Sequence, residues 1–496
     1  MDGVQQGGCQ VSGVGCQVSG WGGPDTWHLT PDTSRFPRPM TTYARRLGLF
    51  SGTMAVVGGI IGGGIFRTPA AVAERVRSPG LTLIAWVLGG VVALIGAFCF
   101  GELGQRRPKA GGGYVYLRET WGPLPAFLYG WALLLVIATG AIAAVAVTFA
   151  SYALALLGLP ERLTDPVATA AIVLLSGINY VGVRPAALTQ NIFTVLKLAA
   201  LATLIAAGVF AGTSTAPYRP LPPSTARGGV VDVVVALGAA LVPVLFTYGG
   251  WQQTNFIAEE IVEPEKNLPH ALVLGVVVVV AVYLLANVAY LRVLGPAGLA
   301  ASTAPAADLM RAQLGPAGGT LIAAGIAVST FGFLNLVILV TPRVLQAMAA
   351  DGVFFRALAE LHPIHRTPAA AILFQAAWAI VLALTGTFSE LVDYVAFGDW
   401  IFFGLTVAGL FIYRARDVTP LPLPTVERGL AGEGAAPRAF RVPGYPWTPV
   451  LFVLAALYVV ASAVLANPRN ALVGTGLLLL GVPVYLVQKP SRVLTP

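Results

Sequence analysis

Long apolar runs without charge recur along this chain and limit its fold more than any other feature. A helix needs about 20 predominantly apolar residues to cross the hydrocarbon of a bilayer. Only 10% of the 496 residues are charged, and the mean hydropathy is +0.77. We therefore predict an all-α polytopic membrane protein with twelve transmembrane helices, near 48–72, 80–103, 124–157, 165–183, 190–212, 233–258, 270–294, 318–341, 368–386, 391–413, 447–467 and 470–488.

The Lys and Arg residues between these runs indicate how the chain is oriented. Cytoplasmic connections of helical membrane proteins carry an excess of Lys and Arg. With the N-terminus inside, 20 of the 30 fall in cytoplasmic connections and 8 in outer ones, while Arg67 and Lys197 lie within runs. Both termini are therefore predicted to be cytoplasmic. The same bias accounts for the net charge of +8, so the bilayer and not a nucleic acid is the expected partner.

The first 40 residues differ in composition from the rest. They are rich in Gly and Ser, and the hexapeptide GCQVSG occurs at 8–13 and again at 15–20. They contain no apolar segment of the kind found in a secretory signal. We expect 1–40 to form a disordered extension, with Met40 as an alternative start.

Glycines interrupt the first apolar run near its centre. The stretch VVGGIIGGGIF at 56–66 places five glycines, Gly58, Gly59, Gly62, Gly63 and Gly64, within seven positions. Close helix packing is one explanation, because Gly59 and Gly63 are spaced as in a small-xxx-small motif. The other is a helix that breaks at mid-depth, where unpaired backbone is tolerated only inside protein or beside a water-filled cavity.

A second interruption favours the break. The sixth run contains Pro243 and the pair Gly249–Gly250. Runs one and six each begin a set of five membrane-crossing runs. Because five is an odd number of crossings, the second set has the opposite orientation in the membrane to the first. Paired interrupted helices in inverted repeats indicate a binding site. This organisation predicts a transport core at 41–413, with repeat one at about 48–212 and repeat two at about 233–413, then a cytoplasmic loop at 414–446 and two accessory helices with a tail at 447–496.

Two broken helices present complementary backbone groups. The half-helix that begins at Gly62–Gly64 offers N–H groups and a positive dipole end, which favour a carboxylate. The halves that end near Ile60 and Phe246 offer carbonyl groups, which suit an ammonium. An α-amino acid carries both groups, and glycine lets it approach the backbone closely.

Several stretches resemble the amino acid–polyamine–organocation (APC) superfamily, and most closely its L-type amino acid transporters and their bacterial relatives. They are GGIIGGGIF, ELGQRRPKAGGGYVYLRETWGPLPAFLYGW, FTYGGWQQTNFIAEEIVEPEKNLPHAL, STFGFLNLVILVTPRVLQAMAADGVFF and FRVPGYPWTPVLF, within residues 45–487. The resemblance implies the leucine-transporter fold, with ten core helices in a 5+5 inverted repeat and two further helices. It also implies secondary active transport of amino acids across the cell (inner) membrane, by proton symport or by amino acid exchange.

The resemblance also implies roles for individual residues. Phe246 and Trp251 would gate the site, and Gly63 stands where the family commonly has Ser. The loop LGLPERLTDP lacks the cysteine that joins eukaryotic L-type members to a partner, so we expect no disulfide-linked heavy subunit. The substrate-binding residues would be Ile60, Ile61, Gly62, Gly63, Gly64, Phe246, Thr247, Tyr248 and Gly249.

Lys197 is the only Lys or Arg deep in a middle run. A lysine there is costly unless it has a function or reaches the interface, and the interface near Gln190 lies about two turns away. In the resembling family a lysine at this position occupies the place of a sodium ion. We therefore expect Lys197 to couple transport to protons, with Ser329 and Thr330 as polar neighbours.

Other residues have weaker signals. Arg67 lines an outer vestibule or reaches the interface, and Trp400, like Trp251, walls a side-chain pocket or simply packs. The acidic residues of 259–265 form a solvated loop or an inner gate. Asp393 and Asp399 are expected to be structural. His362 and His365 lack partners for a metal, so neither a metal nor a cofactor is expected.

Three alternatives to an amino acid carrier are an enzyme, an amino acid sensor and a polyamine or organic amine permease. Motifs of hydrolases, metalloproteases and P-loop enzymes are absent from the sequence, so we do not expect an enzyme. An amino acid sensor on the same fold would bind without transport. A polyamine or organic amine permease would favour an acidic residue in its pocket, and because none stands beside either interruption in the sequence, we expect neutral amino acids.

Overall fold

A computed structural model describes residues 43–210, 230–386, 388–417, 440–466 and 468–487. These segments are helical, and the described residues include no strand beyond an isolated parallel bridge between Leu47 and Ile261. The expected disordered extension at 1–40, with Met40, lies outside the described residues, as do most of the loop at 414–446 and the side chain of Asp393.

Nine helical segments in the described part of the chain are long and apolar enough to cross a membrane. The protein is therefore a multi-pass helical membrane protein. The segments are Pro79–Arg106 (α3), Pro123–Leu157 (α5 to α6), Glu161–Val181 (ending in α7), Val183–Phe210 (α8), Asp232–Glu260 (α9 with η5), Pro264–Ala301 (α10), Pro305–Ala350 (α11), Trp447–Ala466 (α14) and Pro468–Val487 (α15 to α16).

The three remaining predicted runs are helical but fall short of that criterion for separate reasons. The run at 48–72 is divided into shorter helices. The run at 368–386 forms α12 (Ala369–Thr385), which has 17 residues. The run at 391–413 lies in α13 (Phe388–Asp417), whose side chains are described only in part. Twelve crossings therefore stay a prediction.

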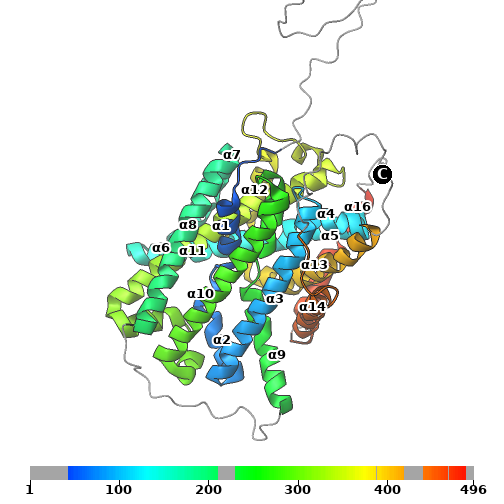
Figure 1. The fold of residues 1–496 in the computed structure, drawn as a ribbon. Helices are drawn as coiled ribbons and strands as arrows, with labels where there is room; N and C mark the ends of the chain where they lie inside the picture. Colours follow the sequence, from blue (N-terminus) through cyan, green and yellow to red (C-terminus); the bar gives the residue numbers. More distant parts are fainter. Residues whose placement is uncertain (1–42, 211–229, 387, 418–439, 467, 488–496) are drawn as a thin grey trace, which may run out of the picture. The chain divides into compact units, whose positions relative to one another are not determined.

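The first apolar run is broken at its glycines. Helix α1 (Leu49–Ile60) ends at Ile60, a 3₁₀ turn follows at Gly64–Phe66, and α2 (Thr68–Val76) continues beyond it. We call residues 61–63 the first break. Figure 1 shows α1 and α2 as separate blue helices at different heights of the bundle. The glycine cluster therefore marks a helix interruption.

The sixth run is broken in the corresponding place. Helix α9 (Val230–Thr247) ends one residue before Tyr248, and a 3₁₀ helix, η5, spans Trp251–Glu260. We call residues 248–250 the second break. Gly250 has φ of 112°, a conformation that residues with a Cβ rarely adopt. Glycine is therefore required at this turn.

The helices pack so that each interrupted helix lies against helices of the other half of the chain. Helix α1 packs on α8, α10 and η5, and α2 packs on α9 and α10. Helix α3 runs beside α10, and α11 packs on α6 and α8. The C-terminal helices α14 and α15 pack on α13. Residues of α6, α11 and α13 lie on the same cavity as the two breaks.

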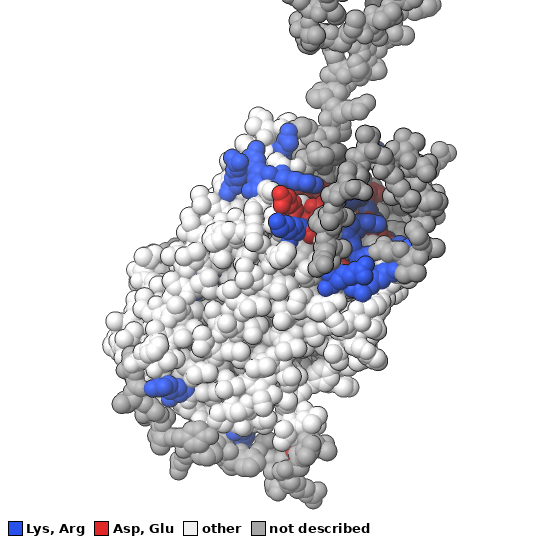
Figure 2. All heavy atoms as spheres, viewed as in Figure 1, with Lys and Arg blue, Asp and Glu red and all other residues white. Residues whose placement is uncertain are grey.

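On the face shown in Figure 2, most of the charged residues lie near one end of the molecule, and the middle of this face is almost free of them. An apolar belt of this kind matches a bilayer. Many of the charges are paired: Glu102 accepts hydrogen bonds from Arg106 and Arg414, and the buried Arg343 contacts Glu260 at 2.7 Å. These pairs hold α3, α11, α13 and η5 together at that end.

Candidate functional site

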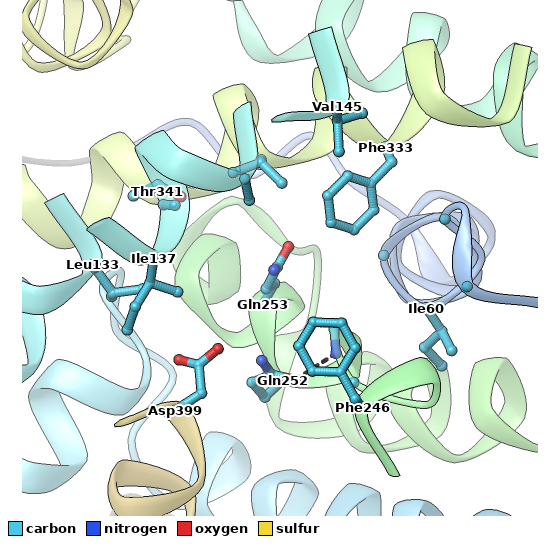
Figure 3. A pocket seen from close by; sticks show the side chains of 18 of the residues that line it. Ile60, Leu133, Ile137, Val145, Phe246, Gln252, Gln253, Phe333, Thr341 and Asp399 are labelled. Carbon is cyan, nitrogen blue, oxygen red and sulfur yellow. Dashed lines mark hydrogen bonds between the residues drawn. The ribbon is translucent and has the colours of Figure 1, made fainter. Parts of the chain in front are cut away.

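A cavity of about 310 Å³ lies between the two breaks (Figure 3). Its wall is mostly apolar, with backbone exposed at the glycines, which is typical of a small-molecule site. The backbone of both breaks contributes, together with residues of α1, α9, α11, α13, η5 and the segment from α5 to α6. The lining residues are Gly59, Ile60, Gly62, Gly63, Gly64, Tyr129, Leu133, Val136, Ile137, Ala138, Ala141, Ala144, Val145, Phe246, Thr247, Gly249, Gly250, Gln252, Gln253, Phe256, Thr330, Phe333, Val337, Thr341, Asp399, Trp400 and Phe403.

The structure brings most of the predicted substrate-binding residues to this cavity. Eight of the residues predicted for binding, coupling or gating line it: Ile60, Gly62, Gly63, Gly64, Phe246, Thr247, Gly249 and Thr330. Five others are buried beside it and do not line it: Ile61, Tyr248, Trp251, Lys197 and Ser329. The last five therefore act on the cavity only through their neighbours.

The first break leaves N–H groups without partners. No hydrogen bond is recorded for the backbone N–H of Gly63 or Gly64 within the described segments, whereas the N–H of Gly62 donates to the carbonyl of Ile60 at 2.9 Å. Because both glycines line the cavity, their N–H groups are available to an anionic group inside it.

The carbonyl groups of the first break are less available than the sequence suggests. The hydroxyl of Tyr283 donates to the carbonyl of Ile60 at 3.1 Å, so this oxygen accepts two protein hydrogen bonds. The hydroxyl of Tyr290 donates to the carbonyl of Ile65 at 3.2 Å. These two tyrosines of α10 hold the broken backbone open.

Lys197 also serves the first break. Its ammonium is buried and donates to the carbonyls of Gly58 at 3.1 Å and Ile61 at 2.7 Å. These carbonyls lie at the C-terminal end of α1, where a cation is stabilised by the helix dipole. The side chain does not reach toward the interface, so snorkelling does not describe it.

Ser329 and Thr330 behave differently from each other. The Ser329 hydroxyl donates to the carbonyl of Gly62 at 3.2 Å and approaches that of Ile61 at 3.4 Å, so it shares an acceptor with Lys197. The Thr330 hydroxyl bonds to carbonyls of its own helix, those of Ile326 and Ala327, both at 2.9 Å. Only Ser329 is thus joined to Lys197 through the break.

The two breaks meet backbone to backbone. A Cβ placed on Gly59 would lie 2.8 Å from the carbonyl oxygen of Gly250, and a Cβ on Gly250 would overlap the carbonyl of Gly59. Thr247 adds a link between the two halves of the chain, because its hydroxyl lies 2.9 Å from that of Thr68 at the start of α2. The two broken helices are thus in direct contact.

Aromatic rings at the cavity have two kinds of environment. Phe246 is 57% exposed and projects into the cavity, where Figure 3 shows it below Phe333. Trp251 is buried, with its ring centroid 5.0 Å from that of Phe100 and 6.1 Å from that of Phe452. Phe246 is therefore in a position to cover a bound molecule, and Trp251 packs behind the wall.

One acidic residue reaches the cavity, and sequence analysis assigned it only a structural role. Asp399 of α13 lines the wall beside Trp400, the residue suggested for a side-chain pocket. Figure 3 shows its carboxylate directed into the cavity near Leu133 and Ile137. The signal was present in the sequence, since an ionisable residue within a transmembrane run is a functional candidate by default.

The remaining weaker candidates lie away from the cavity. Arg67 is exposed after the 3₁₀ turn and does not line the wall. Glu260 is buried and paired with Arg343, whereas Glu263 and Glu265 are exposed. The acidic segment at 259–265 therefore contributes one residue, Glu260, to a buried ion pair, and its other described acidic side chains are at least partly exposed.

The fold and cavity define a class of protein: a multi-pass helical membrane protein with a small-molecule site between two interrupted helices, as in membrane transporters. Residues 47–487 match the model of the amino acid permease family, and the chain belongs to that family. It is an amino acid transporter and not an enzyme.

Curated relatives agree over most of the chain. The chain is 33% identical over 437 residues to the human b(0,+)-type amino acid transporter 1, covering 86% of this chain and 84% of the relative. It is also 33% identical over 448 residues to the human large neutral amino acids transporter small subunit 2, covering 89% of this chain and 80% of the relative.

Proposed function

We propose that this permease binds the α-carboxylate of its substrate on the backbone N–H groups of Gly63 and Gly64 and moves the amino acid by alternating access. Neither N–H group has a hydrogen-bond partner among the described residues, and both glycines line the cavity. A carboxylate there gains hydrogen bonds and about 0.3–2 kcal/mol from the helix dipole. This observation carries the proposal.

The α-ammonium binds at the second break. The carbonyl of Phe246 accepts one bond, from the N–H of Gly249 at 3.1 Å, and a carbonyl oxygen has two lone pairs. The carbonyl of Ile60 already accepts two. Phe246 therefore supplies both an acceptor and, through its ring, an apolar cover over the substrate, with Thr247 and Gly249 alongside.

Alternating access is supported by how the two halves pack. Helix α1 packs on α10, and α9 packs on α3, so each interrupted helix contacts the helix that follows the other interruption. If a twofold axis relates the two halves, α1 corresponds to α9 and α3 to α10. The α1–α10 contact then corresponds to the α9–α3 contact, and the α3–α10 contact corresponds to itself. This is the relation that a 5+5 inverted repeat requires, and it allows the two halves to rock about the site.

Lys197 couples a proton to this movement. Its ammonium holds the last carbonyls of α1, and Ser329 of α11 holds the adjacent ones. Loss of the proton from Lys197 removes the positive charge that strengthens these two hydrogen bonds, which loosens the contact of α8 with α1. Proton symport follows if the proton crosses with the substrate, and amino acid exchange if the substrate alone resets the carrier.

The membrane arrangement completes the proposal. The protein lies in the inner membrane of the cell, with both termini in the cytoplasm. The excess of Lys and Arg in the cytoplasmic connections supports this orientation. The permease works without a disulfide-linked heavy subunit, because the loop between α6 and α7 contains no cysteine. One curated relative is itself named as a small subunit.

A matched pair of variants tests the carboxylate site. Gly63 has φ of −82°, which proline also adopts, and a Cβ there meets nothing within 4 Å. Gly63→Ala keeps the N–H group and Gly63→Pro removes it. In proteoliposomes, we expect Gly63→Pro to raise the KM for leucine at least about tenfold more than Gly63→Ala does, since hydrogen bonds to charged groups contribute about 1.5–3 kcal/mol.

Equal KM values for the two Gly63 variants would contradict the carboxylate site. The same vesicles, loaded with or without leucine and with or without a pH gradient, separate exchange from symport. Uptake that needs internal leucine indicates exchange, and uptake driven by the pH gradient alone indicates symport. Binding of leucine without any uptake in these vesicles would indicate a sensor.

A further inference from the structure

Asp399 is the one charged side chain among the described residues that line the cavity. The lining contains neither Lys nor Arg nor His, and Tyr129 is its other titratable member. Asp399 is partly exposed, while its neighbours Trp400 and Phe403 are buried at 6% and 5% exposure. The carboxylate therefore faces the cavity and not the protein interior.

Nothing recorded in the described part of the chain satisfies this carboxylate. Among the described residues it makes no hydrogen bond or ion pair, although the amides of Gln252 and Gln253 line the same cavity. The side-chain oxygen of Gln252 is engaged by the N–H of Gly250 at 3.0 Å, and the side-chain oxygen of Gln253 is buried without a partner. A carboxylate against apolar walls is costly unless a cation or a donor compensates it. A cation or hydrogen-bond donor that enters the cavity would supply this compensation.

The position of Asp399 indicates which part of a substrate supplies that partner. Figure 3 places Ile60 of the first break on one side of the cavity and Asp399 on the other, with Gln252 and Gln253 between them. An amino acid held by its α-groups at the breaks therefore directs its side chain toward Asp399. The walls along that path include the apolar residues Leu133 and Ile137.

We infer that Asp399 selects amino acids whose side chain ends in a positive charge, with lysine and its shorter and longer analogues as the substrate class. The inference rests on the proposed binding of the α-groups at the breaks. The apolar walls hold the methylene chain, and the carboxylate pairs with the terminal ammonium. The reason for expecting neutral substrates, the lack of an acidic residue beside either break in the sequence, does not apply to the folded protein.

Three probes that differ by one group each test the inference. Norleucine is lysine without its terminal amino group, and cadaverine is lysine without its carboxyl group. Uptake of each is measured in proteoliposomes of the full-length permease, for the unmodified protein, for Asp399→Asn and for Asp308→Asn. Asp308 is a matched control because it is an aspartate of α11 outside the cavity, partly exposed and near Arg311.

We expect the unmodified permease to prefer lysine to norleucine, and Asp399→Asn to lower the lysine-to-norleucine ratio of kcat/KM at least about tenfold. Asp308→Asn leaves that ratio unchanged. A preference of the unmodified protein for norleucine overturns the inference whether or not Asp399→Asn folds, and so does a ratio that Asp399→Asn leaves unchanged. Uptake of cadaverine equal to that of lysine contradicts instead the proposed carboxylate site, so the two failures are distinguishable.

Discussion

The contact between Gly59 and Gly250 leads to a sharp prediction about Gly250→Ala. The added methyl group overlaps the carbonyl of Gly59, which is backbone and cannot rotate away. The same substitution forces alanine into φ of 112°. Both effects act at the point where the two broken helices touch, so the substitution strains the centre of the transport site.

The magnitude follows from these two terms. A residue with a Cβ in such a sparsely populated conformation costs about 1–3 kcal/mol. Forcing an extra methyl group into a closely packed contact costs about 1–3 kcal/mol more. We therefore expect Gly250→Ala to destabilise the folded protein by about 2–6 kcal/mol, a large part of a typical total stability of about 5–15 kcal/mol.

Gly59→Ala is expected to cost less, because its conformation is helical and one of its two close neighbours is the movable side chain of Leu336. The double variant is expected to cost less than the sum of the two, since a single separation of α1 from η5 relieves both overlaps. The control is Gly140→Ala in α6, where a Cβ meets nothing within 4 Å. It should leave stability unchanged or raise it by up to about 1 kcal/mol.

The assay is thermal unfolding of the purified protein in detergent, together with leucine uptake in proteoliposomes. Gly250→Ala should lower the midpoint and abolish uptake, whereas Gly140→Ala should leave uptake unchanged and should not lower the midpoint. A Gly250→Ala protein with the stability and uptake of Gly140→Ala would refute the backbone contact between the breaks.

Three further predictions follow from the site and its surroundings. Lys197→Met removes two hydrogen bonds of a charged group, so uptake should fall at least about tenfold and should depend less on pH. An unchanged uptake rate with an unchanged pH dependence would exclude a coupling role for Lys197. Glu260→Gln leaves the buried Arg343 without its carboxylate and should destabilise the protein by about 3–5 kcal/mol. Glu265→Gln, at an exposed position, is the control and should have little effect. Similar midpoints of thermal unfolding for the two variants would contradict this prediction. Phe246→Ala removes a ring from the cavity and should weaken leucine binding by about 1.5–3 kcal/mol, seen as a higher KM, and an unaltered KM would show that the ring does not contact the substrate.

The two breaks could be predicted because glycine has a local effect. Five glycines in seven positions, and a proline with a glycine pair in the sixth run, weaken helices wherever they stand. The structure confirms that α1 ends at Ile60 and α9 at Thr247, but α9 continues through Pro243, so the second break lies at the glycine pair and not at the proline. Backbone positions near these ends consequently line the cavity as expected.

Side-chain directions could not be predicted in the same way. The segment after the second break is a 3₁₀ helix, in which neighbouring positions face different directions than in an α-helix, and Trp251 consequently packs against Phe100 and Phe452. The tyrosines that occupy carbonyls at the first break come from α10, more than 200 positions along the chain. Asp399 reaches the cavity because α13 packs against η3 (Leu133–Ile137) and α6 (Ala138–Leu157), a contact that no local pattern in the sequence encodes.

The bridge between Leu47 and Ile261 has a consequence for how the carrier opens. The N–H of Leu47 donates to the carbonyl of Glu260 at 2.9 Å, and the N–H of Val262 donates to the carbonyl of Leu47 at 2.8 Å. The polypeptide just before α1 is thus fastened to the polypeptide just after η5, while Gly59 and Gly250 touch at the far ends of the same two segments. Because α1 and η5 are joined at both ends, we expect them to move as one unit, so that release of substrate toward the Leu47 end would require both to tilt together.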